Sequence, residues 1–303
     1  MNKNLFTLSI GIPAYNEEAN IKRLLSALLG QKEEGFVLKE VIVISDGSSD
    51  KTVVEARSIT SDKIFVVDNK DRKGQAERQN DILKLFQGDI LVLLNADVLP
   101  TNEYFLREIV KPFYTNENIG IVGAALSPQM GGTFFERVMS FGFYFRENIF
   151  LNMNNRDNLY LCRGAARAFS KEFTSTLKWP VDVVGEDVYS YLRCRSQEYS
   201  FSYQKSAVVM FRSPDNFFDY LKQSQRFVHS KIVFSQYFSE AFIDEQFRVP
   251  LVLKLKFTIS TFVSHPIYFL YYCFAMLLTR LLPVNVQSTR SKWDIARSSK
   301  ELR

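Results

Sequence analysis

Residues 41–50 read VIVISDGSSD, an unbroken apolar run that ends in a polar turn. The run is β-branched and shows no alternation of apolar and polar positions, which is typical of a strand buried on both faces. Such strands occur mainly in parallel sheets that carry helices on each side. This stretch therefore predicts an α/β protein.

Similar apolar runs lie before and after it: TLSIGIP at 7–13, KIFVV at 63–67 and ILVLL at 90–94. The segments between these runs carry apolar residues at helical spacing, at 16–29, about 50–59 and 76–86. Asn16 is the expected N-cap of the first helix. Strands separated by helices imply right-handed crossovers, so we expect a mostly parallel, Rossmann-like sheet covered by helices.

The composition narrows the function classes. A chain of 303 residues is longer than one small domain, so we expect either a large core with an appendage or two domains. The formal net charge of +5 suits anionic partners such as diphosphates or acidic lipid head groups and does not require nucleic acid. Three scattered cysteines, Cys162, Cys194 and Cys273, lack zinc-site spacing and indicate a reducing compartment.

Polar residues cluster directly after three of the predicted strands. They are Pro13-Ala14-Tyr15-Asn16-Glu17, Asp46-Gly47-Ser48-Ser49-Asp50 and Asn95-Ala96-Asp97. Each cluster alone is an ordinary turn. Ligands of such sheets bind at the carboxyl ends of the strands, where these clusters would meet. Together they offer carboxylates for a nucleotide diphosphate and a divalent cation.

The turn after the first strand argues against two other α/β classes. A nucleotidyltransferase should have a Gly-rich phosphate loop at this position, and a Rossmann dehydrogenase needs G-x-G-x-x-G. The sequence has Pro13-Ala14-Tyr15 there instead.

With these motifs in view, the chain resembles the family 2 glycosyltransferases, whose catalytic domain has the GT-A fold. The resemblance extends from about Leu8 to Phe227. The matching segments follow the family's order and read SIGIPAYNEEANI, VIVISDGSSD, RKGQAERQN, LLNAD, GED and QSQRF. The resemblance implies an inverting, nucleotide-sugar-dependent transferase, with UDP-sugars favoured as donors and GDP-sugars as the other option.

The resemblance also implies a donor site. Tyr15 would stack on the nucleobase, Glu17 would reach the ribose, Asp46 would bind the base edge, and Lys73 would lie near the base and phosphates. Asn95 would accept a bond from a ribose hydroxyl. The remaining donor-binding residues at these turns would be Pro13, Ala14 and Ala96.

Asp97 matches the second aspartate of the family's D-x-D motif, which holds Mn²⁺ or Mg²⁺ on the donor diphosphate. The first position of the motif is Asn95, which brings no charge to a metal. The ion would therefore rest on Asp97 and the diphosphate alone. Asn95 is also the one feature that favours the alternative function, a catalytically weak GT-A-like membrane scaffold or partner subunit.

Gly185-Glu186-Asp187 matches the family's G-E-D motif. The resemblance implies that Asp187, with Glu186 beside it, is the catalytic base that deprotonates the acceptor hydroxyl. A carboxylate at a helix start also has an ordinary role, because it complements the helix dipole. Gln223 and Arg226 belong to a segment similar to the family's Q-x-x-R-W motif, with Phe227 in place of Trp, and would contact the donor.

Two Phe-rich segments suggest a membrane surface. Phe134–Met153 is expected to be an interfacial helix, a lid over an acceptor channel or a buried helix. Phe257–Leu282 is long and apolar, but it contains Pro266 and has basic residues on both flanks. A helical hairpin broken at Pro266, or a helix in the interface, is preferred over a single span.

These observations give one expected organisation. Residues 1–100 would form the nucleotide-sugar-binding half of a GT-A domain, 101–230 the acceptor-binding half, and 231–303 a hydrophobic, membrane-associating helical region. The enzyme would act at the cell membrane with its catalytic domain in the cytoplasm. Its acceptor would be a lipid-linked one, such as a polyprenyl phosphate, or a glycan, in polysaccharide or glycoconjugate biosynthesis.

Overall fold

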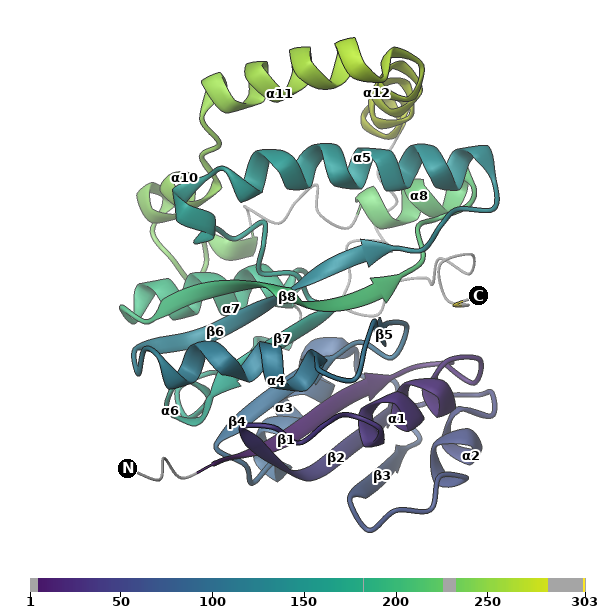
Figure 1. Ribbon diagram of the computed structural model, residues 1–303, viewed down its shortest axis with the longest axis vertical. Coiled ribbons are helices and arrows are strands. Elements are labelled where there is room, and N and C mark those ends of the chain that lie inside the picture. The colour runs from purple at the N-terminus through teal and green to yellow at the C-terminus, as the bar shows by residue number, and fades with distance from the viewer. Residues whose placement is uncertain (1–4, 182, 226–232, 283–301, 303) are drawn as a thin grey trace.

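The computed structural model describes residues 5–181, 183–225, 233–282 and 302 (Figure 1). In this part of the chain, strands form one eight-stranded sheet with the order β3-β2-β1-β4-β7-β6-β8-β5. The strands are β1 Phe6–Ala14, β2 Phe36–Asp46, β3 Ile64–Asn69, β4 Ile90–Leu94, β5 Leu99–Pro100, β6 Ile119–Pro128, β7 Ala166–Ser170 and β8 Ser200–Phe211.

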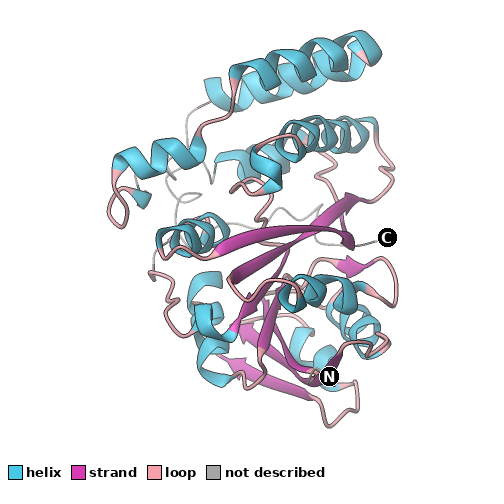
Figure 2. Ribbon diagram, turned by 60° about the vertical axis from the view of Figure 1, so that its left-hand side comes forward, coloured by secondary structure: helices cyan, strands magenta, loops and turns pink. Residues whose placement is uncertain are grey.

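Helices cover both faces of this sheet, and further helices lie at one end of the molecule (Figure 2). The α-helices are α1 Ile21–Leu29, α2 Thr52–Arg57, α3 Gln75–Leu85, α4 Phe105–Val110, α5 Phe134–Leu151, α6 Lys171–Thr174, α7 Glu186–Ser196, α8 Phe217–Gln225, α10 Glu240–Phe247, α11 Leu251–Ser264 and α12 Pro266–Leu281. Two short 3₁₀ helices are η1 Lys111–Tyr114 and η2 Asn154–Arg156.

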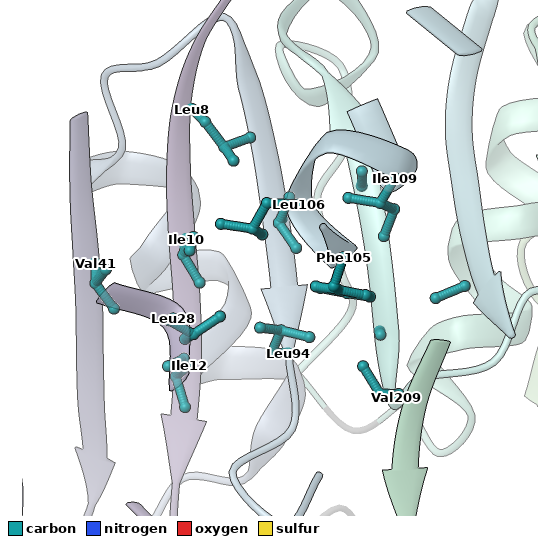
Figure 3. Packing of buried hydrophobic residues seen from close by; sticks show 14 of the residues in the cluster. Leu8, Ile10, Ile12, Leu28, Val41, Leu94, Phe105, Leu106, Ile109 and Val209 are labelled. Carbon is teal, nitrogen blue, oxygen red and sulfur yellow. The ribbon is translucent and has the colours of Figure 1, made fainter. Parts of the chain in front are cut away.

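The β2 strand is buried on both faces, as its sequence predicts. Val41 and Val43 belong to a core cluster that includes side chains of α1, α2 and α4, whereas Ile42 and Ile44 belong to a second cluster with side chains of α3, α6 and α7. Figure 3 shows the first of these clusters, in which Val41 lies near side chains from β1 and α1. The continuous apolar run is therefore explained by two separate cores that meet at the sheet.

The mostly parallel sheet is confirmed only for the N-terminal half. The strands β3, β2, β1 and β4 are all parallel to their neighbours. In the other half, β7 runs antiparallel to both β4 and β6, and β5 runs antiparallel to β8. The chain reaches β7 through β5, β6 and α5 rather than through one crossover helix, so the parallel rule does not apply there. The sheet as a whole is mixed and continues across residue 100.

The first helix begins later than its sequence predicts. Asn16 is not an N-cap, because α1 begins at Ile21 with Asn20 at the N-cap position. Asn16 has a φ of 52°, and its side-chain oxygen accepts a hydrogen bond from Ser49 N at 2.9 Å. Asn16 therefore joins the turn after β1 to the turn after β2 and leaves the helix to begin one turn later.

The C-terminal helices α11 and α12 lie over α5 on the side away from the sheet (Figure 1). The break between them falls at His265–Pro266, as the sequence predicts. In the described residues, none of the helices combines the length and the apolar character that crossing a bilayer requires. The buried ring of Tyr272 packs directly on α5 at Gly142, where a Cβ atom would lie 2.1 Å from its Cε2.

Candidate active site

Asp46, at the end of β2, organises the turn that precedes α3. Its Oδ1 accepts hydrogen bonds from Lys73 N and Arg78 Nε, both at 2.7 Å, and its Oδ2 accepts one from Gly74 N at 2.9 Å. Asp46 and Arg78 are both buried. Gly47 follows with a φ of +72°, and a Cβ there would lie 2.9 Å from Lys70 O. The D-G-S turn thus holds the Lys70–Gly74 loop against the sheet edge.

Tyr15 lies at the same edge, directly after β1. The guanidinium of Arg72 sits 3.9 Å from the centre of its ring. Pro13 and Ala14 are the last residues of β1 and place Tyr15 at this edge through their pairing with β2. Glu17 is buried, and its Oε2 accepts a hydrogen bond from Asn20 Nδ2 at 3.0 Å. Contacts of Tyr15 and Glu17 with a nucleotide stay predictions.

Asn95, Ala96 and Asp97 follow β4. The Asn95 Oδ1 accepts a hydrogen bond from Gln75 Nε2 at 2.9 Å, and Ala96 is buried. The half-buried Asp97 carboxylate accepts no hydrogen bond from any described residue, so its oxygens are available to a ligand. Carboxylate oxygen is a donor that Mn²⁺ and Mg²⁺ prefer, and Asp97 therefore fits the expected metal.

The described residues contain no group of three or more His, Cys, Asp or Glu side chains arranged to hold a metal ion. A cation at Asp97 would take further oxygen ligands from a bound molecule such as the donor diphosphate. The three cysteines are free: Cys162 and Cys194 are buried and Cys273 is half-buried.

Asp187 lies in the first turn of α7. Its Oδ2 accepts a hydrogen bond from Gly164 N at 3.0 Å, and its Oδ1 accepts one from Val188 N at 2.8 Å. The neighbouring Glu186 is buried, and its backbone carbonyl accepts a hydrogen bond from Trp179 Nε1 at 2.8 Å. These contacts fix the start of α7 and orient the Asp187 carboxylate.

A short segment before β7 makes hydrogen bonds both to Asp187 and to the turn after β4, at the sheet edge where the donor is predicted to bind. Ala165 O accepts a hydrogen bond from Asn95 N at 3.0 Å, and the adjacent Gly164 N donates to Asp187. Asn95 is in turn bonded to Gln75 at the start of α3. Adjacent hydrogen bonds thus connect the turns after β2 and β4 with the base candidate, although more than ninety residues separate Asn95 from Asp187 in the chain.

Asp187 also opens into a cavity of about 750 Å³ between α5, α7, α8 and α12. Arg146, Arg163 and Arg280 line this cavity together with several aromatic side chains. Sequence reasoning missed these three arginines, because isolated arginines are common on protein surfaces and no motif singles them out. Sequence reasoning also gave no role to Arg78, although RKGQAERQN contains it.

The structure describes only part of the Gln223–Phe227 segment, which is also expected to contact the donor. Gln223 lies in α8 and is half-buried. Arg226 and Phe227 lie outside the described residues, so their contact with the donor stays a prediction. Lys73 is exposed at the donor edge, and its backbone rather than its ammonium group contacts Asp46.

Comparisons with known proteins identify the family of the chain. Residues 9–176 match the family model described as glycosyl transferase family 2. Glucosyl-3-phosphoglycerate synthase of Mycobacterium tuberculosis is 30% identical over 120 residues, which are 38% of this chain and 36% of that protein. An undecaprenyl-phosphate 4-deoxy-4-formamido-L-arabinose transferase of Shewanella sediminis is 30% identical over 128 residues, 40% of this chain and 38% of that protein. In sequence, the chain thus spans little more than a third of the length of these relatives.

Solved structures extend the similarity to the fold. A mannosyltransferase of Pyrobaculum calidifontis, in complex with GDP-Man and Mn²⁺, gives a TM-score of 0.61 at 17% identity, covering 94% of this chain and 78% of that one. The Mycobacterium tuberculosis synthase, with Mn²⁺ and UDP, gives 0.54 at 18% identity, covering 76% and 78%. The fold is therefore GT-A-like. Since the family model matches more than half of its length, the chain belongs to glycosyl transferase family 2.

Proposed function

We propose that this protein is an inverting glycosyltransferase that moves a sugar from a nucleotide-sugar to a hydroxyl group of an acceptor. The observation that carries this proposal is the hydrogen-bonded connection between Asn95, the 164–165 segment and Asp187. It places a carboxylate beside the edge of the sheet where α/β proteins bind nucleotides. Family membership supports the same reaction.

In this reaction the acceptor hydroxyl gives its proton to the Asp187 carboxylate. The oxygen forms a bond to the anomeric carbon of the donor while the bond from that carbon to the diphosphate breaks. Attack from the face opposite the leaving diphosphate inverts the configuration. The hydrogen bonds from Gly164 N and Val188 N hold the carboxylate in one orientation, which aligns the base before the acceptor arrives.

The donor would bind across the turns after β1, β2 and β4. Tyr15 and Arg72 offer a flat cationic surface to a base, and Lys73 adds an exposed positive charge near the phosphates. Asp97 would hold Mn²⁺ or Mg²⁺ with the diphosphate, and a bound ion would neutralise the charge of the leaving group. UDP in one related structure and GDP-Man in another make both nucleotides candidates.

We also propose that the protein works at the cytoplasmic face of the cell membrane. Many large apolar side chains of α11 and α12 are exposed, among them Val252, Ile259, Leu270 and Phe274. Monomeric proteins in water rarely expose so much apolar side-chain surface on two neighbouring helices. Such a surface is typical of a site that contacts lipid or another protein. The α11–α12 pair would lie in the interface rather than cross the membrane. The acceptor would then be lipid-linked or a glycan held near that surface.

A donor-binding screen tests the proposal. UDP- and GDP-sugars are added to the purified protein with Mn²⁺ or Mg²⁺, and thermal unfolding and donor hydrolysis are followed. A cognate donor should raise the melting temperature in proportion to its concentration relative to its Kd. Asp97→Ala should abolish the metal-dependent part of the shift. If no nucleotide-sugar shifts the melting temperature, or if Asp97→Ala responds like the wild type, the proposed donor site is wrong.

A further inference from the structure

The cavity next to Asp187 has the size of a ligand head group. Its volume is about 750 Å³, within the range of small-molecule sites. Asp187 and Val188 of α7 lie on its wall, and α12 contributes Tyr272, Met276 and Arg280. The proposed catalytic base and α12 therefore share one cavity.

The lining of this cavity carries an excess of positive charge. Among the described lining residues there are three arginines, Arg146, Arg163 and Arg280, and a single carboxylate, Asp187. Arg163 pairs with Glu147 at 3.0 Å. Arg146 and Arg280 form no ion pair with any carboxylate in the part of the chain that the structure describes. Both residues are exposed, so their guanidinium groups are accessible to an anionic ligand.

A buried hydroxyl group points to the same ligand. Tyr272 is 2% exposed and lines the cavity, and its Oη makes no hydrogen bond of good geometry with the described residues, although the Tyr220 hydroxyl lies close to it. Buried hydroxyl groups are almost always hydrogen-bonded, because leaving one unpaired costs free energy. Tyr220 lies beside it, and burial, with the Tyr272 hydroxyl as a smaller cause, raises the pKa of Tyr220 to about 12. Tyr220 therefore keeps its proton, and both phenols can donate to a phosphate oxygen.

The rest of the cavity wall is mostly apolar, with the hydroxyl groups of Ser224 and Thr279 among its polar parts. Phe143 and Phe150 of α5 and Met276 of α12 line the cavity. Leu277 is exposed and lies three residues before Arg280, so the two side chains are neighbours on the helix. Phe274 is exposed one further turn along. An apolar surface thus begins at the arginines and continues over α12.

We propose that this cavity binds a lipid-linked acceptor through its phosphate. The phosphate lies at Arg146, Arg163 and Arg280 with the Tyr272 hydroxyl as a further donor, and the lipid chain leaves over the exposed faces of α12 and α11. A hydroxyl of the head group then reaches Asp187. This inference rests on the proposed transferase function and specifies the acceptor class of the same site.

Dodecyl phosphate, used below its micelle-forming concentration in phosphate-free buffer, tests the head-group site. Its binding to the full-length protein is measured by calorimetry and compared with dodecyl maltoside, which lacks the phosphate, and with inorganic phosphate, which lacks the chain. Dodecyl phosphate should bind tightest. Equal binding of dodecyl maltoside would overturn the phosphate site, and equal binding of inorganic phosphate would overturn the lipid chain.

A pair of double variants with the same charge change locates the site. Arg146→Gln/Arg280→Gln should weaken dodecyl phosphate binding about ten- to a hundredfold, since bonds between charged groups are lost. Arg57→Gln/Arg137→Gln removes two exposed arginines outside the cavity lining and should bind like the wild type. Equal losses in both variants would show a general charge effect and overturn the proposal.

The variant Tyr272→Phe tests whether the Tyr272 hydroxyl binds the ligand or only stabilises the fold. Because the hydroxyl makes no hydrogen bond of good geometry with the described residues, its removal should change the melting temperature of the ligand-free protein little. Dodecyl phosphate binding should still weaken about two- to tenfold. A lower melting temperature with unchanged binding would remove Tyr272 from the site.

The same proteins distinguish this inference from the proposed function. Nucleotide-sugar binding depends on the turns after β1, β2 and β4 and should be equal in the arginine variants and the wild type. If nucleotide-sugars bind but dodecyl phosphate does not, the acceptor inference fails and the transferase proposal stands. If dodecyl phosphate binds at the cavity and no nucleotide-sugar binds, the transferase proposal fails.

Discussion

Asp46 has three donors around its carboxylate, and all of them come from the segment that begins α3. Its ion pair with Arg78 is buried on both sides. A buried ion pair contributes little net stability when intact, but loss of one partner leaves a charge without compensation. Asp46, which the resemblance predicts to contact the base, therefore holds the loop before α3 in shape.

Arg78→Met tests this role. The free energy of unfolding should fall by about 3–5 kcal/mol, because Asp46 stays buried without its cation. Arg107→Met is the matched control, since Arg107 pairs with Glu34 and Glu108 at an exposed site, and it should cost at most about 1 kcal/mol. Urea unfolding followed by circular dichroism measures both. If Arg78→Met lowers the free energy of unfolding no more than Arg107→Met does, the backbone amides of Lys73 and Gly74 are sufficient to stabilise the Asp46 carboxylate.

Among the elements, α12 has two different faces. Tyr272 and Ala275 are buried against α5, whereas Leu270, Phe274 and Leu277 are exposed. The contact of Tyr272 with Gly142 fixes which face is buried. The outward face is therefore the one available to a membrane surface.

Vesicle flotation tests that surface. Val252→Ser/Phe274→Ser on α11 and α12 should lower partitioning onto phosphatidylcholine–phosphatidylglycerol vesicles by about tenfold or more, because two exposed apolar side chains are lost. The control is Val54→Ser/Phe65→Ser, which alters side chains of the same types, 64% and 52% exposed, in the donor half. The control should float with the vesicles like the wild type. Loss of flotation in both variants, or in neither, would argue against an α11–α12 membrane surface.

Some helices and strands could be predicted from local sequence patterns, and others could not. The run at 41–44 predicts a strand buried on both faces, and Pro266 predicts the break between α11 and α12, because both effects are local. The antiparallel β7 has no such signal, since its direction depends on the path of the chain through β5, β6 and α5. The packing of α12 on α5 also escapes local reasoning, because Gly142 and Tyr272 are 130 residues apart.

In the whole molecule, the two halves of the chain meet at one site. The resemblance identified Asp97 and Asp187 separately, but only the structure shows that the segment at Gly164 and Ala165 connects their neighbourhoods. The arginine-lined cavity could not be predicted, because Arg146, Arg163 and Arg280 come together only through the packing of α12 near α5. The sequence thus offers candidate residues for the donor, whereas the cavity beside Asp187 becomes visible only in the structure.

The central claim is that Asp187 acts as the base for a donor bound at the other half of the molecule. Asp187→Asn keeps the size of the side chain and removes the proton acceptor. The decisive measurement is kcat for sugar transfer together with the Kd of the nucleotide-sugar, in the wild type and in this variant. We predict that kcat falls about 10²–10⁴-fold while the Kd stays unchanged. An unchanged kcat, or a loss of donor affinity as large as the loss of rate, would contradict the account.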